Sequence, residues 1–200
     1  MYDDDFSEQE LSDRLSLIES MIAEGRRSVE SWGWMFVLWG VVYYAAMAWS
    51  LWGHNVWAWP VTVSIGIVIA IFLASSKANH RPPTTLSRAI ISIWIAMGIS
   101  MFLLFAALGW TGRLMDQHVF VAVISALLGV ANGASALILR WKLQLACAIV
   151  WWATAAASCF GTDAQCTAVF LVATFLCQIV FGLYGVIGEA HKRKRRPLHA

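Results

Sequence analysis

The chain has 200 residues, of which 60% are hydrophobic and only 13% are charged. An average soluble domain carries roughly 25% charged residues, so this composition excludes an ordinary soluble protein. The formal net charge of +2 says little, because acidic residues gather before the first long apolar segment and basic residues gather at 191–196. The length leaves no room for a separate soluble catalytic domain beside several membrane-spanning helices.

An acidic tail, residues 1–6, precedes a predicted amphipathic helix at residues 7–30. Ser7 and Glu10 make a capping box, in which each side chain accepts a hydrogen bond from a backbone N–H group at the helix start. Apolar residues then recur at the spacing of one helix face, with Gly25 in place of one of them. These residues are Leu11, Leu15, Ile18, Ile22 and Val29.

Three roles fit this helix: it lies on the membrane surface, pairs with a second copy as a short coiled coil, or packs on another protein. Helices that bind a membrane surface usually carry Lys and Arg along the polar face. Anionic lipid would repel the polar face of this helix, because it is mostly acidic. Its acidic residues are Glu8, Glu10, Asp13, Glu19 and Glu24. The two protein-binding roles together are therefore favoured.

Six apolar segments follow, each close to the ~20 residues that a helix needs to cross a ~30 Å hydrocarbon layer. They belong to a predicted transmembrane domain of residues 31–190, with spans at 33–52, 56–75, 89–109, 118–139, 143–160 and 167–187. Tryptophans are abundant near the span ends, where an indole favours the lipid–water interface. Short connections predict that consecutive spans lie side by side as three antiparallel hairpins. The predicted fold class is an all-α polytopic membrane protein with six transmembrane helices, preceded by an amphipathic cytoplasmic helix.

The basic residues predict the orientation of these spans. Thirteen of the 14 Lys and Arg residues lie before the first span, after the last one or in every second connection, and Arg113 is the exception. Short basic segments resist translocation across a membrane, so these segments and both termini are predicted to be cytoplasmic. The predicted localisation is the plasma (inner) membrane, with multiple passes.

No Asp, Glu, Lys, Arg or His lies in the middle of a predicted span, which disfavours a proton-coupled transporter. Asn132 and Gln178 are predicted to bond neighbouring helices or, alternatively, to line a solute site. Gly129 and Gly133 form a GxxxG motif that allows close approach of another helix. Span 118–139 is therefore predicted to be central in the bundle or dimer-forming.

Four residues near the predicted exterior face carry groups that metals and enzymes use: His54, Asp116, His118 and Asp163. Their spacing matches no metal motif, so they are interpreted as loop residues, and no metal or other cofactor is predicted. Cys159 and Cys166 flank the last exterior connection, where a disulfide would join two spans if that face is oxidising.

The last span is followed by a basic tail, residues 191–200. Its cations are predicted to bind anionic lipid headgroups, at about 1 kcal/mol for each cation near the surface. They are Lys192, Arg193, Lys194, Arg195 and Arg196. The alternative is contact with the acidic N-terminal helix of the same or a neighbouring chain. Nucleic-acid binding is not predicted, because no folded module presents these charges.

The lack of catalytic groups and the partner-type helix favour a non-enzymatic sensor, regulatory or assembly protein. It would engage a protein partner or a second copy through residues 7–30 and span 118–139. The alternative is a transporter or channel for a neutral or weakly polar solute, lined by Asn132, Gln178, Ser100, Ser135 and Thr174. An enzyme that acts on lipid through the four exterior residues is the third and least favoured hypothesis.

Overall fold

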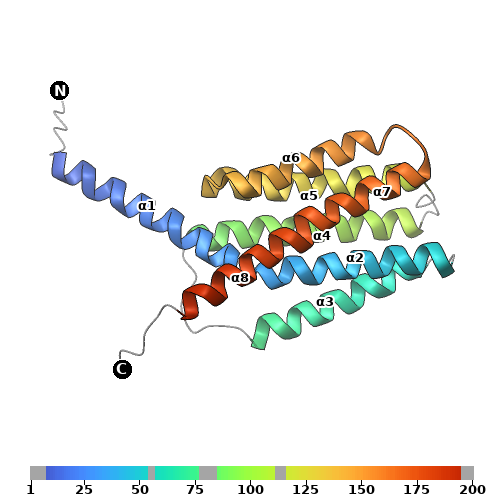
Figure 1. Cartoon of the computed structure of the whole chain (residues 1–200), viewed down its shortest axis with the longest axis horizontal. Helices are drawn as coiled ribbons and strands as arrows, with labels where there is room; N and C mark the ends of the chain where they lie inside the picture. Colours follow the sequence, from blue (N-terminus) through green and yellow to red (C-terminus); the bar gives the residue numbers. More distant parts are fainter. Residues whose placement is uncertain (1–7, 54–56, 77–84, 111–115, 195–200) are drawn as a thin grey trace.

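The computed structural model describes residues 8–53, 57–76, 85–110 and 116–194. Within these ranges the chain is helical apart from short turns (Figure 1). In chain order the helices are α1 (Glu8–Ser31), α2 (Gly33–Gly53), α3 (Ala58–Ser76), α4 (Thr85–Trp110), α5 (Gln117–Leu139), α6 (Lys142–Ala157), α7 (Asp163–Thr174), the π-helix η1 (Phe175–Val180) and α8 (Phe181–Lys194).

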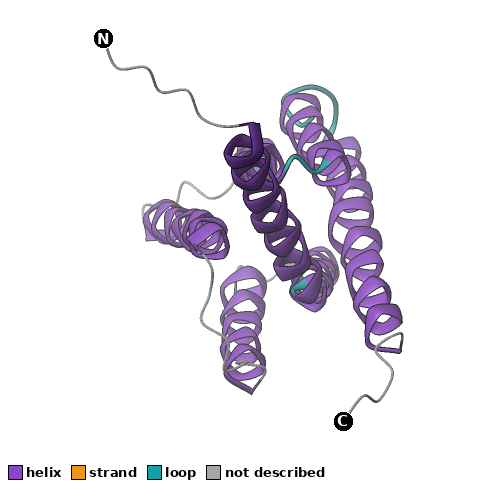
Figure 2. Ribbon diagram, turned by 90° about the vertical axis from the view of Figure 1, so that its left-hand side faces the viewer, coloured by secondary structure: helices purple, strands orange, loops and turns teal. Residues whose placement is uncertain are grey.

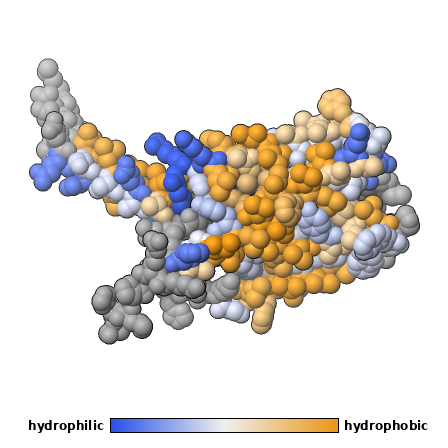
Figure 3. All heavy atoms as spheres, viewed as in Figure 1, coloured by the Kyte–Doolittle hydropathy of each residue, from blue (hydrophilic) through white to orange (hydrophobic). Residues whose placement is uncertain are grey.

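Five helical segments within the described residues are long and apolar enough to cross a membrane. They are α2, α3, most of α4, α5 and the continuous segment from α7 to α8, whereas α6 is apolar but has only 16 residues. Large apolar side chains such as Phe72, Phe102 and Leu137 are exposed on the outside of the bundle. Figure 3 shows this apolar surface in orange over most of the visible face. A surface of this extent suits lipid chains better than water, which indicates a membrane-embedded protein.

The first part of α1 projects from one end of the bundle, and α8 ends at the same end (Figure 1). Viewed from that end, the other helices run side by side (Figure 2). We call this end the α1 end. At the opposite end α6 turns into α7, and His118 lies beside the end of α6. We call this the His118 end.

α5 and α6 are the most closely packed helix pair. A Cβ atom on Gly133 would lie 2.7 Å from Trp152 Cη2, and Gly129 is also covered by the Trp152 indole. The GxxxG motif therefore makes room for a tryptophan of the next helix in the same chain. The predicted hairpin neighbours also touch (α2 with α3, α4 with α5, and α6 with α7), but the closest pair joins two of those hairpins.

α2 and α8 cross at glycines, where their backbones meet. A Cβ atom on Gly33 would lie 2.6 Å from the Gly182 carbonyl oxygen, and one on Gly182 would lie 2.8 Å from the Gly33 carbonyl oxygen. Further along, the Tyr44 hydroxyl donates a hydrogen bond of 2.8 Å to the Leu171 carbonyl of α7. α2 is therefore attached to the last helical segment along much of its length.

An aromatic cluster fills the core in the half of the bundle nearer the His118 end. Its rings come from six helices: Tyr43, Trp59, Phe105, Phe120, Trp151 and Phe170. Ring centroids lie 4.6 Å apart between Trp59 and Phe120 and 4.8 Å apart between Phe105 and Phe120. Tilted and edge-on ring pairs of this kind stabilise a core beyond the area they bury. Most other side chains of α3 and α4 face outward, and the Phe120 ring links both helices to α5 through Trp59 and Phe105.

Candidate functional site

The projecting part of α1 exposes the predicted apolar stripe. Leu11, Leu15 and Ile18 are 53–55% exposed, whereas Ile22 is half-buried and Val29 is 7% exposed within the core. The stripe therefore has two parts. Its start is open to a partner, and its end packs in the core of its own chain.

Gly25 marks the point at which α1 meets the bundle. A Cβ atom here would lie 2.7 Å from Leu139 Cδ2 and 2.8 Å from Leu86 Cδ2. α1 therefore rests on α5 and α4 at Gly25, where the ends of the Leu139 and Leu86 side chains occupy the space of a Cβ atom. The interruption in the apolar pattern is where the helix changes from a free surface to a packed one.

Arg26 ties α1 to the end of α5. Its Nε donates a hydrogen bond of 2.8 Å to the Leu139 carbonyl, and its Nη2 donates to the Arg140 carbonyl. The last carbonyls of a helix have no partner within it, and a cation there also interacts favourably with the helix dipole. Arg140 ends α5 in the left-handed conformation, with φ of 47°. One guanidinium thus caps α5 and fixes the angle at which α1 leaves the bundle.

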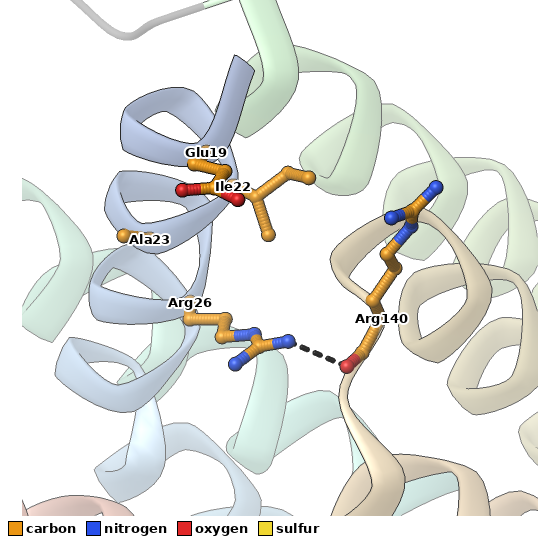
Figure 4. Close-up of a pocket in the computed structure, with 5 residues that line it drawn as sticks. All are labelled: Glu19, Ile22, Ala23, Arg26 and Arg140. Atoms are coloured by element: carbon orange, nitrogen blue, oxygen red, sulfur yellow. Dashed lines mark hydrogen bonds between the residues drawn. The ribbon is translucent and has the colours of Figure 1, made fainter. Parts of the chain in front are cut away.

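A cavity of about 310 Å³ opens beside this contact. One wall is formed by α1 and the other by Arg140 at the end of α5 (Figure 4). Its lining residues are Glu19, Ile22, Ala23, Arg26 and Arg140. The cavity is open to solvent, and Glu19 and Ala23 on its α1 wall are exposed. Because Ile22 belongs to both features, the cavity adjoins the exposed stripe.

Seven polar side chains of α5, α6, α7 and η1 are buried within the bundle. We call these residues, which are at most 3% exposed, the polar seam: Ser125, Asn132, Ser135, Gln144, Thr154, Thr174 and Gln178. Asn132 donates one bond of 2.9 Å to Leu128 of its own helix, and Ser135 accepts one of 3.2 Å from Trp94. Neither amide atom of Gln144 has a hydrogen-bond partner, nor do Asn132 Oδ1 and Gln178 Oε1. These atoms are buried polar groups without a hydrogen-bond partner in the described part of the chain.

Two features of the seam have no counterpart in the sequence prediction. Gln144 was not among the predicted site residues, yet its side chain is fully buried. Gln178 lies in η1, and π-helical turns occur often at functional sites. Ser100, proposed as a lining residue, is exposed on α4 and donates a hydrogen bond to the Ala96 carbonyl of its own helix.

His118 joins three helix ends at the other end of the bundle. Its Nδ1 lies 2.6 Å from the carbonyl oxygen of Ser158, which ends α6, and its Nε2 lies 2.9 Å from Asp163 Oδ1 in the first turn of α7. Asp116 caps α5 and accepts the backbone N–H of His118 at 2.9 Å. Three of the four predicted exterior residues therefore meet, and His54 lies outside the described residues. In the described part of the chain, no three His, Cys, Asp or Glu side chains are arranged to hold a metal.

The turn between α6 and α7 places Asp163 opposite His118. Gly161 has a backbone φ of 92°, which residues other than glycine rarely adopt. Thr162 and Gln165 then form a capping box that starts α7. The position of the Asp163 carboxylate is thus set by a turn with its own hydrogen bonds.

The cysteines of this turn are free thiols in the structure, with Cys159 exposed and Cys166 buried. Cys159 lies 3.5 Å from the Ala155 carbonyl of its own helix. A disulfide between them stays a prediction for an oxidising face. In the basic tail, α8 continues to Lys194, but the side chains of residues 192–196 lie outside the described part of the chain.

Comparisons of the chain with protein-family models, with curated proteins and with solved structures gave no match.

Proposed function

We propose that the chain is a six-span membrane protein with cytoplasmic termini. The segregation of Lys and Arg supports this orientation. The ends of α1 and α8 also support an even number of crossings, because both lie at the α1 end (Figure 1). α6 would be the short span: its 16 residues rise about 24 Å, and a bilayer adapts to a few ångströms of mismatch.

Within this membrane we propose a non-enzymatic role as a sensor, regulator or assembly partner that engages another protein through α1. The single observation that carries the proposal is the exposed stripe of Leu11, Leu15 and Ile18 on a helix that projects beyond the bundle. Burying one such side chain is worth about 1.5–3 kcal/mol, so a groove that accepts the stripe would gain substantially. The partner expected is a protein with an apolar groove and a basic rim, which would complement the acidic face of α1.

The test is native mass spectrometry of the chain extracted gently from its host membrane. The wild type should carry a reproducible additional protein mass, and the triple variant Leu11→Ser, Leu15→Ser, Ile18→Ser should lose it. Leu17→Ser is the matched control, because Leu17 is 61% exposed but lies at least about 100° around the helix from each stripe residue. Equal retention of the partner mass by the triple variant and the control would refute the role of the stripe. An extra mass equal to that of the chain would identify a second copy as the partner.

A second candidate is a transporter or channel for a neutral or weakly polar solute. The unpartnered amide atoms of Gln144, Asn132 and Gln178 within the polar seam support it. Vesicles that contain the purified chain should then swell faster in glycerol or urea than empty vesicles, and Gln144→Leu should remove the difference. Equal swelling of both kinds of vesicle would reject this candidate.

A further inference from the structure

Both ring nitrogens of His118 face oxygen atoms that can only accept a hydrogen bond. Nδ1 lies 2.6 Å from a backbone carbonyl oxygen, and Nε2 lies 2.9 Å from a carboxylate oxygen. A neutral imidazole has one N–H group, so either tautomer would direct a lone pair at one of these oxygens. The imidazolium, with two N–H groups, is the form that satisfies both contacts.

We propose that His118 is a proton-binding site that joins the ends of α5, α6 and α7 when its ring carries both protons. The inference goes beyond the proposed function and does not depend on the partner of α1. If the proposed orientation holds, the proton comes from the exterior side of the membrane.

The groups around the His118 ring favour its positively charged form. Ser158 ends α6, and the carbonyls at a helix C-terminus carry partial negative charge. The described ionisable groups that act on the ring are Asp163 of α7 and Asp116, the N-cap of α5. The Cys166 thiol lies within reach of the same two carboxylates and of Cys159. Two acids and a helix end thus surround the imidazole, with no described Lys or Arg among these groups.

Loss of one proton would remove one of the two contacts of His118. A second link survives, because Gln117 Nε2 donates to the Asp163 carbonyl and to Thr167 Oγ1 and neither bond involves a titrating group. The α5–α7 contact would therefore persist at high pH, while the α6–α7 turn would loosen. Because the bonded form carries the proton, the contacts of His118 with α6 and α7 are complete at low pH and weaken as the pH rises and the ring loses a proton.

Hydrogen exchange of the full chain in lipid particles tests the proposal at about pH 5 and about pH 8, on either side of the usual histidine range. The quantity compared is the protection factor, corrected for the intrinsic exchange rate at each pH. Protection of the first turn of α5 and of residues 158–166 should fall by about threefold to tenfold at the higher pH, as expected for the loss of a charge-assisted hydrogen bond with one exposed partner.

His118→Gln should show the same protection at both pH values, because an amide does not titrate in this range. His191→Gln is the matched control. His191 is exposed near the end of α8, where its Nδ1 contacts the Ile187 carbonyl of the same helix, so this variant should behave like the wild type. Asp163→Asn keeps the shape of the side chain and removes its charge, so the difference in protection between the two pH values should become smaller. This variant tests the proposal if His118→Gln does not fold. Equal protection of the wild type at both pH values, or the same fall in His118→Gln or Asp163→Asn as in the wild type, would overturn the proposal.

Discussion

Replacing Gly33 by alanine is a quantitative test of the crossing between α2 and α8, next to the point where α1 joins the bundle. The new Cβ atom would lie 2.6 Å from the Gly182 carbonyl oxygen and 2.9 Å from the Val186 backbone nitrogen. Both are backbone atoms, so no side-chain rotation relieves the overlap. An ordinary contact begins at 3.4 Å, which requires the two helices to separate locally by about 0.8 Å.

Overpacking of this kind costs about 1–3 kcal/mol, and alanine returns about 0.5–1 kcal/mol by reducing the freedom of the unfolded chain. The expected net loss in the free energy of unfolding therefore lies between about 0 and 2.5 kcal/mol, with a midpoint of about 1 kcal/mol. Gly182→Ala should lose a similar amount, because its Cβ atom would meet the Gly33 carbonyl oxygen at 2.8 Å.

Gly98 and Gly188 are the controls, because a Cβ atom on either would meet nothing within 4 Å. Alanine at these positions should raise the free energy of unfolding by up to about 0.5–1 kcal/mol. Unfolding of the four variants by a denaturing detergent, monitored by circular dichroism, measures the differences. If Gly33→Ala is as stable as Gly98→Ala, the backbone contact between α2 and α8 does not exist as described.

Two further predictions concern the candidate sites. Arg26→Gln removes the charged donor to two carbonyls at the end of α5, so hydrogen exchange of residues 9–24 should quicken and about 1–2 kcal/mol of stability should be lost. Arg14→Gln, which removes an exposed pair with Glu10, should change stability by at most about 0.5 kcal/mol, and equal effects of the two variants would contradict the role of Arg26. Gln144→Leu removes two buried amide atoms that lack partners, so detergent unfolding should show a gain of about 1–3 kcal/mol. A loss instead would contradict the expectation that this amide is unsatisfied.

The helices could be located from the sequence because apolar length and periodicity are local properties. α2 runs from Gly33 to Gly53 where residues 33–52 were predicted, and α1 runs from Glu8 to Ser31 where 7–30 were predicted. The length of the last helical segment was underestimated, since residues 167–187 were predicted and the helix covers residues 163–194. Polar residues at both of its ends continue the helix, which an apolar window does not detect.

The contacts between helices could not be predicted in the same way. The apolar stripe on α1 could be read from the sequence. The sequence did not reveal that Val29 packs in the core of its own chain. Gly129 and Gly133 indicated close packing without revealing that Trp152 is their neighbour. His118 and Asp163 are 45 residues apart, and their contact depends on how three helices meet. Such contacts are set by tertiary packing, and a single sequence contains no local signal for them.

The π-helical turn η1 sets how the final helix is rotated relative to the part before it. A π-turn takes up one more residue than an α-turn, so it acts as an insertion that the helix absorbs without breaking. Shortening Phe175–Val180 by one residue would rotate every later side chain by about 100° around the helix axis. Gly182 would then turn away from Gly33, while Asp163 would keep its place beside His118. The two ends of this long helix thus pack against different neighbours, and the additional residue in η1 allows both ends to face the correct one.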